Sequence, residues 1–284
     1  MINKLGIIAG SKRTANLLLD TYPADAGYSL RKLRTDYSGY ALKVRREADD
    51  YEADVEFDSD NTVSLTSGVA NLSGGSGATL GDWAGSDTVR AVTWYDQSAN
   101  NRDITTSTES RQPKLIGSGS LEVYNGRVAL DFYNDLLQRS DASSESQPNS
   151  FLAVVKSDNT SSGLYLVDGD GSGGRNLLGQ QGSKRRLWAG GWSGSAANDQ
   201  DQAIWLGVFA GSSSQLSING VNATSLSPGS QAMSGFSLGS RFSGSNGWRG
   251  YVQEIVHWNS NQSLDPTNNR VAIVTNANDY YSVF

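Results

Sequence analysis

The stretch Leu121-Glu-Val-Tyr-Asn-Gly-Arg-Val-Ala-Leu-Asp-Phe132 decides the fold class of this chain. Apolar and polar residues alternate on both sides of Asn125-Gly126, as expected for two half-buried strands. An Asn-Gly pair readily adopts the positive φ angles of a type I′ turn, so this stretch predicts a β-hairpin. The same pattern recurs in Gln215-Leu-Ser-Ile-Asn-Gly-Val-Asn222, which predicts a second hairpin that turns at Asn219-Gly220.

Further alternating or apolar stretches predict the remaining strands. They cover residues 41–46, 53–57, 89–95, 151–155, 163–167, 203–209 and 247–258. The 284 residues include 32 glycines, and the strands do not alternate with long helical stretches. Many short strands separated by glycine turns are typical of all-β proteins. We therefore expect an all-β fold, an antiparallel two-sheet sandwich with short peripheral helices.

Two helices and one domain complete this prediction. The spacing of Leu30, Leu33 and Tyr37 predicts a short amphipathic helix over residues 26–36. A final helix is predicted near the end of the chain, with Ser263 as its cap, Pro266 in its first turn, and Val271 and Val274 on one face. The sandwich domain is predicted to span residues 23–284. Residues 1–22 form an N-terminal arm, either a docking segment or the first strand of the domain.

The charge balance bears on the class of partner. The formal net charge is −6 and the isoelectric point is about 4.8. Nucleic-acid binding needs a basic face, so we expect no nucleic-acid partner. Lys184-Arg185-Arg186 is interpreted as a solvated strand end. No stretch approaches the ~20 apolar residues of a membrane span, and Leu5–Gly10 is too short for a secretory signal.

The sequence offers few groups for metal or thiol chemistry. It has no Cys and a single His, His257, which lies in a predicted strand and is interpreted as structural. A zinc site with several His or Cys ligands is therefore excluded. Asp168-Gly-Asp-Gly-Ser-Gly-Gly174 lacks the glutamate that closes an EF-hand calcium loop, and we interpret Asp168 and Asp170 as turn residues. We predict no metal and no cofactor.

Two phrases in the first half carry a family resemblance. They are Tyr28-Ser-Leu-Arg-Lys-Leu-Arg-Thr-Asp-Tyr-Ser-Gly39 and Thr93-Trp-Tyr-Asp-Gln-Ser-Ala-Asn-Asn-Arg-Asp103. They resemble the catalytic domain of family 54 α-L-arabinofuranosidases and related domains of phage structural proteins. The second half resembles concanavalin A-like lectin domains more generally. The resemblance implies a jelly-roll sandwich of the concanavalin A-like type.

The resemblance also indicates where the catalytic carboxyls of such an enzyme would lie. Retaining glycosidases use two carboxyls about 5–5.5 Å apart. The position that corresponds to the acid/base Asp is Ser243, in the loop of residues 238–247. The counterpart of the nucleophile strand is residues 176–188. Neither segment contains Asp or Glu. We therefore expect the chain to lack glycosidase activity.

Aromatic residues on a glycine-rich turn are the best candidates for ligand binding. Trp188-Ala-Gly-Gly-Trp192 places two indoles close together, and aromatic rings stack on the apolar faces of sugars. The candidate ligand residues are Trp192, Trp188, Arg186, Asp199 and Ser243. Burial of the tryptophans in the core is the alternative, most open for Trp188.

The resemblance suggests a biological role and a location. It implies a phage virion protein of the tail, fibre or capsid surface, with a catalytically empty lectin-like domain. Such a protein would be made in the host cytoplasm, form a homo-oligomer, contact other virion proteins and bind a cell-surface glycan. The alternatives are an arabinofuranosidase-like hydrolase that acts on glycans and a bacterial carbohydrate-binding module.

Overall fold

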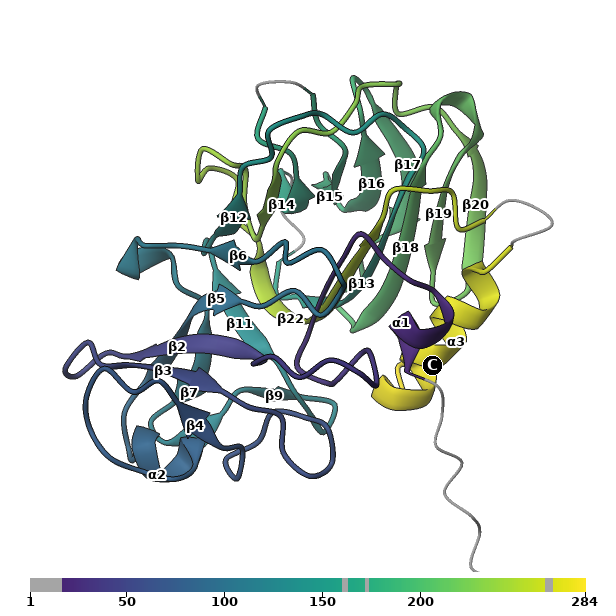
Figure 1. The fold of residues 1–284 in the computed structure, drawn as a ribbon. Helices are drawn as coiled ribbons and strands as arrows, with labels where there is room; N and C mark the ends of the chain where they lie inside the picture. Colours follow the sequence, from purple (N-terminus) through teal and green to yellow (C-terminus); the bar gives the residue numbers. More distant parts are fainter. Residues whose placement is uncertain (1–16, 160–162, 172–173, 264–267) are drawn as a thin grey trace, which may run out of the picture.

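The computed structural model describes residues 17–159, 163–171, 174–263 and 268–284, without the side chains of residues 195 and 222–225. Its strands form two layers (Figure 1). Every ladder between the named strands is antiparallel. The predicted all-β sandwich is therefore confirmed, whereas its jelly-roll strand order stays a prediction.

The first layer is built around the longest strand, β22 (Arg249–Trp258). Along one side of β22 lie β1 (Ala26–Ser29) and β11 (Leu130–Tyr133), each paired with a different half of it. The other side continues through β13 (Asn149–Ser157), β18 (Ala203–Phe209), β19 (Ser214–Ile218) and β20 (Val221–Leu226).

The second layer contains shorter strands in a longer row. In spatial order they are β4 (Val69–Ala70), β3 (Glu52–Val55), β2 (Leu42–Arg46), β5 (Val89–Trp94), β6 (Ile104–Thr105), β12 (Leu137–Arg139), β21 (Phe236–Leu238), β14 (Leu164–Asp168), β15 (Leu177–Gln181), β16 (Lys184–Trp188) and β17 (Trp192–Ala197).

One strand joins the layers into a nearly closed sheet. This strand, β7 (Lys114–Gly117), pairs with β5 of the second layer and with β11 of the first. It also pairs with β8 (Ser120–Leu121), while β9 (Val123–Tyr124) and β10 (Arg127–Val128) form a separate hairpin.

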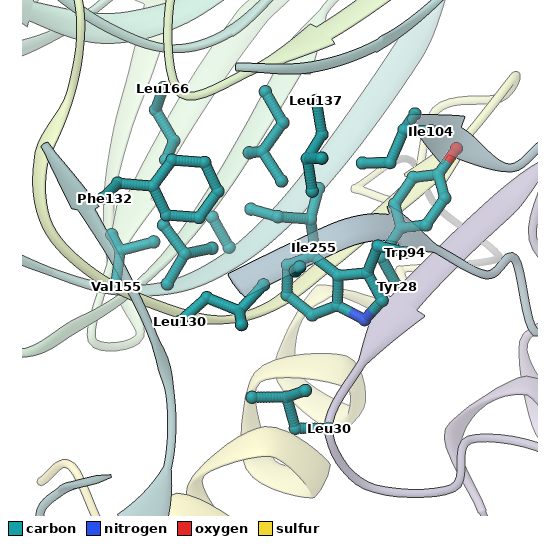
Figure 2. Packing of buried hydrophobic residues seen from close by; sticks show 14 of the residues in the cluster. Tyr28, Leu30, Trp94, Ile104, Leu130, Phe132, Leu137, Val155, Leu166 and Ile255 are labelled. Carbon is teal, nitrogen blue, oxygen red and sulfur yellow. The ribbon is translucent and has the colours of Figure 1, made fainter. Parts of the chain in front are cut away.

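The main hydrophobic core fills the space between the layers. Figure 2 shows Trp94 and Leu137 from the second layer packed with Phe132, Val155 and Ile255 from the first. All five side chains are almost completely buried. Each contributes roughly 1.5–3 kcal/mol through removal of its apolar surface from water.

The helices cover the outer face of the first layer. Helices α1 (Leu18–Thr21) and α3 (Arg270–Tyr281) pack against it through a second apolar cluster. The short α2 (Leu80–Ala84) and the 3₁₀ turns η1 (Glu109–Arg111) and η2 (Gly211–Ser213) lie elsewhere.

Several local predictions are confirmed. Tyr124 pairs with Arg127 around Asn125-Gly126, and Ile218 pairs with Val221 around Asn219-Gly220. All four turn residues have positive φ angles of 50–78°. This geometry fits the type I′ turns that the two Asn-Gly pairs predict.

Other local predictions are wrong. Residues 26–29 form β1 instead of a helix, because hydrogen bonding to β22 outweighs the weak helical spacing. Val271 is exposed, and the buried side of α3 is formed by Ile273, Val274, Ala277 and Tyr281. The predicted start of this helix at Pro266 lies outside the described residues.

Two further expectations concern the chain end and the basic run. Residues 1–16 of the predicted arm lie outside the described residues, while Leu18 and Leu19 are buried in the second apolar cluster. Arg185 was expected to be solvated but is buried, because it faces the interior of the sandwich over the ring of Trp205.

A search of the described helices finds none that is long and apolar enough to cross a membrane.

Candidate functional site

A row of polar residues crosses the outer face of the second layer. Strand register places their positions side by side across seven strands. From β3 to β14 they are Asp54, Lys43, Thr93, Thr105, Gln138, Ser237 and Asp168. Because side chains alternate along a strand, the neighbours of these residues supply the core below, and this face is left with hydroxyl, amide and charged groups.

Two adjoining cavities form a groove on this face. Their volumes are about 730 and 560 Å³, and both are lined by Arg45 and Glu109. Thr105 and Gln138 of the polar row line the smaller cavity. The larger one is lined by Arg45, Glu47, Asp50, Arg90, Glu109, Ser110, Tyr133 and Asp135. Such a lining offers hydrogen-bonding groups and carboxyls to a polar ligand.

Asp135 is the most perturbed carboxyl in this groove. It lies in the turn between β11 and β12, where its Oδ2 accepts a hydrogen bond from the Tyr133 N–H at 2.7 Å. Burial raises the pKa of Asp135 to about 6, against the lowering effect of that hydrogen bond and of Arg90. A carboxyl that keeps its proton up to about pH 6 is suited to general-acid chemistry.

Arginines hold two other carboxylates at the rim of the larger cavity. Arg45 Nη1 lies 2.5 Å from Asp50 Oδ1, and its Nε donates to Gln112 Oε1 at 2.8 Å. Arg90 pairs with Glu47. The ring of Tyr133 is 68% exposed and lies under the guanidinium of Arg249, so it provides an aromatic surface beside these charges.

Arg111 connects three segments around the groove. It belongs to η1, which also carries Glu109, and its Nη1 donates to the carbonyls of Asn134 at 2.8 Å and Gly244 at 2.7 Å. The loop that contains Gly244 also contains Phe242, which lines the smaller cavity, and Ser243, which is exposed. The predicted position Ser243 therefore lies in a loop that borders the groove.

Trp188 and Trp192 lie together on the second layer. They are cross-strand partners in β16 and β17, both half-buried, and neither belongs to the core. The Trp192 ring lies 6.0 Å from that of Tyr165. The guanidinium of Arg175 covers Trp188 at 4.8 Å and Tyr165 at 5.5 Å. Burial of the two tryptophans in the core is thus excluded.

The other predicted residues are distributed differently. Arg186 pairs with Gly179 on the face that carries Trp188. Asp199 follows β17 and binds Arg185 Nη2 at 2.6 Å, near the opposite end of β16 from Trp188. Asp168 is buried and forms a bidentate ion pair with Arg175. The structure therefore brings together Trp188, Trp192 and Arg186 but not Asp199.

The Tyr-Asp-Gln-Ser phrase fixes loops instead of presenting a reactive group. Asp96 Oδ1 accepts from the N–H groups of Gly27 and Ser98, each at 2.8 Å. Gln97, completely buried, accepts from the Leu33 N–H at 2.7 Å and donates to the Ser29 carbonyl at 3.0 Å. These contacts attach the loop after β5 to the segment that contains the other sequence phrase.

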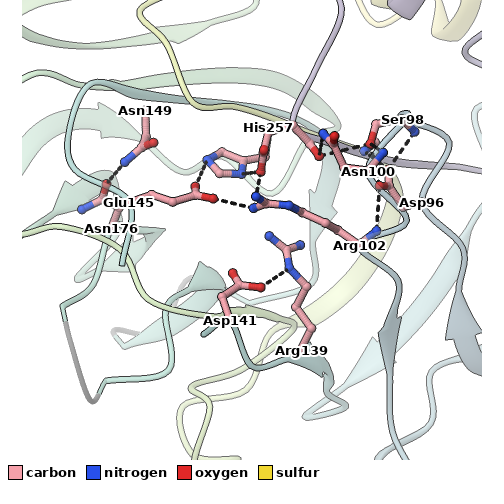
Figure 3. Close-up of polar contacts among 12 residues, drawn as sticks. Asp96, Ser98, Asn100, Arg102, Arg139, Asp141, Glu145, Asn149, Asn176 and His257 are labelled. Atoms are coloured by element: carbon pink, nitrogen blue, oxygen red, sulfur yellow. Dashed lines mark hydrogen bonds and ion pairs between the residues drawn. The ribbon is translucent and has the colours of Figure 1, made fainter. Parts of the chain in front are cut away.

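One cluster has the composition of a metal site. Potential ligand atoms of Asp25, Glu145 and His257 lie within 4.8 Å of one another. Figure 3 shows Glu145 and His257 beside Arg102. Arg102 Nη1, however, is 2.6 Å from the Asp25 carboxylate and 2.5 Å from that of Glu145. Burial acts to raise the pKa of Asp25, but the hydrogen bond with His257, followed by the charges of Arg102 and Arg139, lowers it. A guanidinium thus takes the place between the carboxylates that a metal ion would need.

No protein-family profile and no curated protein sequence matches this chain. Solved structures do match. A family 54 α-L-arabinofuranosidase soaked with a cyclic sulfate inhibitor superposes with a TM-score of 0.64 at 13% identity. An arabinofuranosidase complexed with arabinofuranosyl-α-1,2-xylobiose gives a TM-score of 0.61 at 15% identity. Each match covers 91% of this chain and 63% of the other.

The chain has the fold of the family 54 arabinofuranosidases. A Glu-to-Gln mutant of such an enzyme, soaked with 4-nitrophenyl α-L-arabinofuranoside, matches equally, with a TM-score of 0.63. This chain spans less than two thirds of the length of these enzymes, 63% in each case. The expected resemblance to family 54 is therefore supported at the level of the fold.

Two interpretations of the sequence are wrong in the light of these matches. The virion role is contradicted, because the three matching structures are arabinofuranosidases. The conclusion that the chain is no enzyme is also contradicted. It rested on the lack of carboxyls in residues 176–188 and 238–247, whereas the groove carries Glu47, Asp50 and Asp135 from other segments.

Sequence reasoning missed these carboxyls for a physical reason. Asp50 and Asp135 lie in turns between strands, where Asp commonly satisfies backbone amides, so their sequence signal is that of ordinary turn residues. Glu109 follows a run of Thr and Ser residues that has no periodicity. Only the folding of these segments beside one another distinguishes them from other surface acids.

Proposed function

We propose that this chain is a glycan-active hydrolase of the arabinofuranosidase type, which cleaves furanosyl residues from a larger glycan. The observation that carries the proposal is Asp135, a buried carboxyl with its pKa raised to about 6 in a groove that also contains other carboxyls. The shared fold with arabinofuranosidases supports the choice of substrate class.

The proposed chemistry needs two carboxyl groups. Asp135 donates its proton to the glycosidic oxygen as the bond from that oxygen to the sugar breaks. Glu109, which lines both cavities, is the second carboxylate. It either attacks the sugar directly or removes a proton from the attacking water, and the anomeric configuration of the released sugar distinguishes these two roles.

Binding of the rest of the glycan is assigned to aromatic surfaces near the groove. Tyr133 is the exposed ring at the larger cavity. Trp188, Trp192 and Arg186 lie further along the same layer and are proposed to contact more distant sugars. Ser243, in the loop that borders the groove, is proposed to donate a hydrogen bond to a bound hydroxyl group. Asp199 is left out because it binds Arg185.

The test is hydrolysis of 4-nitrophenyl α-L-arabinofuranoside. We expect Asp135→Asn to lower kcat/KM by roughly 10²–10⁴-fold, since it removes the proton donor but keeps the side-chain shape. Glu109→Gln should cause a comparable loss. Asp87→Asn, which removes a carboxyl outside both cavities, is the matched control. Absence of turnover by the unmodified protein, or full activity of Asp135→Asn, contradicts the proposal.

The pH profile provides an independent readout. Because Asp135 must be protonated to donate, kcat/KM of the unmodified protein should fall as the pH rises above about 6. The residual activity of Asp135→Asn should lack this limb. A profile that stays level between pH 5 and 8 argues against Asp135 as the acid.

A further inference from the structure

Another cavity, apart from the two already described, lies where the two sequence phrases that carry the family resemblance meet. Its volume is about 650 Å³, and it lies beyond the end of β5 that bears Trp94. The lining comes from residues 34–39 of the first phrase, from Tyr40 directly after it, and from residues 95–103 of the second. An adjoining cavity of about 350 Å³ shares residues 37–40 with it and extends to Phe57. Together they form a continuous surface, named here the tyrosine groove.

Aromatic side chains form much of this groove. The rings of Tyr40 and Tyr95 lie 6.3 Å apart, and those of Tyr37 and Phe57 lie 6.3 Å apart at 75°. The hydroxyl group of Tyr37 donates to the Tyr40 carbonyl at 2.8 Å. That of Tyr95 donates to Asp54 Oδ1 at 2.6 Å. The rings are thus held in place, half-exposed, as surfaces on which sugar rings can stack.

The backbone of the groove is fixed before any ligand binds. Asp96 Oδ2 accepts from the Ser98 hydroxyl group at 2.6 Å and from the Arg102 N–H at 2.9 Å, in addition to its two bonds through Oδ1. Gln97 attaches the same loop to the segment that precedes Arg34. A preorganised surface loses little conformational entropy on binding, which favours affinity for a flexible polymer.

The charges of the groove indicate the kind of glycan. The carboxyl groups that line it are those of Asp36, Glu56, Asp58, Asp96 and Asp103. They face two cations, Lys32 and Arg34, and Arg34 is paired with Asp36 at 2.7 Å. Burial raises the pKa of Asp103. Carboxyl groups therefore outnumber cations among the described lining residues, so the net charge that a uronic acid would meet is negative. A neutral sugar therefore fits this surface, whereas an acidic one is repelled.

The tyrosine groove lies at a distance from the carboxyl-bearing cavities. Tyr95 binds Asp54 near one end of β3, while Arg45 and Asp50 lie near the other end of the β2–β3 hairpin. Glu52, the strand partner of Arg45, lies two residues from Asp54 along β3, which is about 7 Å at about 3.3 Å per residue. A ligand that reaches both regions must therefore extend over more than one sugar unit.

We infer that the tyrosine groove binds a neutral polysaccharide chain. The inference rests on the proposed function in one respect. This respect is that the bound polysaccharide is the polymer from which the hydrolase removes furanosyl groups. Tyr40 and Tyr95 stack on its sugar rings, and Asp103 and Asn101 accept or donate hydrogen bonds to its hydroxyl groups. The polymer is then the preferred substrate over a small glycoside.

The test compares polymer binding with small-substrate turnover. Neutral arabinoxylan is titrated into the full chain by affinity electrophoresis and calorimetry, with polygalacturonate as the acidic polymer. Tyr40→Ala should weaken arabinoxylan binding by about threefold to tenfold, the range expected for one lost stacking contact. Tyr40→Phe should retain binding. Turnover of 4-nitrophenyl α-L-arabinofuranoside should be unchanged in both variants.

Tyr124→Ala is the matched control, since Tyr124 is a half-buried ring packed on Tyr251 outside the groove. Equal polymer affinity of Tyr40→Ala and the unmodified protein, with both folded by circular dichroism, overturns the inference. Tighter binding of polygalacturonate than of arabinoxylan overturns it as well. Polymer binding that depends on Tyr40 without any turnover supports this site and contradicts the hydrolase proposal.

Discussion

At the scale of single residues, Asp135 shows how burial defines a chemical role. Its carboxyl receives one backbone hydrogen bond, from Tyr133, and is 3% exposed. Burial removes hydration that stabilises the ionised carboxylate, and this hydrogen bond and the nearby arginines replace only part of that free energy. The pKa therefore rises to about 6. The same type of residue at Asp96 receives four hydrogen bonds and serves as a structural anchor.

This raised pKa predicts a pH-dependent stability. The unfolded pKa is 3.8, so between pH 4 and 6 the folded state binds more protons at Asp135 than the unfolded state does. Its contribution to the free energy of unfolding therefore decreases as the pH rises through this window, by roughly 3 kcal/mol at most. Urea unfolding at pH 4, 5, 6 and 7 measures it. The free energy of unfolding of Asp135→Asn should not show this decrease with pH, whereas that of Asp87→Asn should show it. If the free energies of all three proteins change with pH in the same way, Asp135 is not the group responsible.

At the scale of elements, two glycines of positive φ have different reasons for being glycine. Gly126 turns the β9–β10 hairpin at φ 72°, and a Cβ there would meet no atom within 4 Å. Gly239 follows β21 at φ 90°, and its Cβ would lie 2.4 Å from the ring of Phe132 and 2.7 Å from the Asp135 carbonyl oxygen. The loop that carries Ser243 can leave β21 only because this position lacks a side chain.

Alanine substitution should separate the two cases. Gly126→Ala should lower the free energy of unfolding by about 1 kcal/mol, the conformational cost alone. Gly239→Ala adds a clash with Phe132 and should lower it by about 3 kcal/mol. The midpoints of urea unfolding, with unchanged slopes, measure both. Equal losses would show that the neighbours of Gly239 move away at little cost.

At the scale of the whole molecule, a buried ion pair joins the two ends of the described chain. Arg31, which follows β1, binds Glu254 of β22 through two hydrogen bonds, at 2.7 and 3.0 Å. The hydroxyl group of Tyr281 in α3 donates to the same carboxylate at 3.2 Å. Glu254 is completely buried. The pair thus connects the first strand, the central strand and the last helix.

Loss of one partner should destabilise the whole fold. Glu254→Ala leaves the Arg31 guanidinium buried without its counter-charge, so we expect a loss of about 3–5 kcal/mol in the free energy of unfolding. The comparison is Asp36→Ala, which removes the exposed partner of Arg34 and should cost less than about 1 kcal/mol. Thermal and urea unfolding measure both. Similar small losses in the two variants would contradict a structural role of the buried pair.

The sequence by itself determined the fold class and the local turns of this protein. Alternation around Asn125-Gly126 and Asn219-Gly220 is a local property, because side-chain direction along a strand and the φ preference of Asn-Gly need no distant contact. The phrases at residues 28–39 and 93–103 indicated the family 54 fold. The spacing of apolar residues wrongly predicted a helix at residues 26–29, where pairing with β22 decides the structure.

The candidate site was decided by the tertiary structure alone. Asp135, Glu109 and Arg45 come from three distant segments, and no spacing in the sequence predicts that they line one groove. Their chemistry also depends on burial, since the pKa of a carboxyl follows from the hydration that the folded chain removes. The family resemblance pointed to Ser243, whereas the carboxyls of the groove lie in turns, at Asp50 and Asp135, and in η1, at Glu109. Local alternation fixes which way a side chain points, but only long-range packing fixes what it faces.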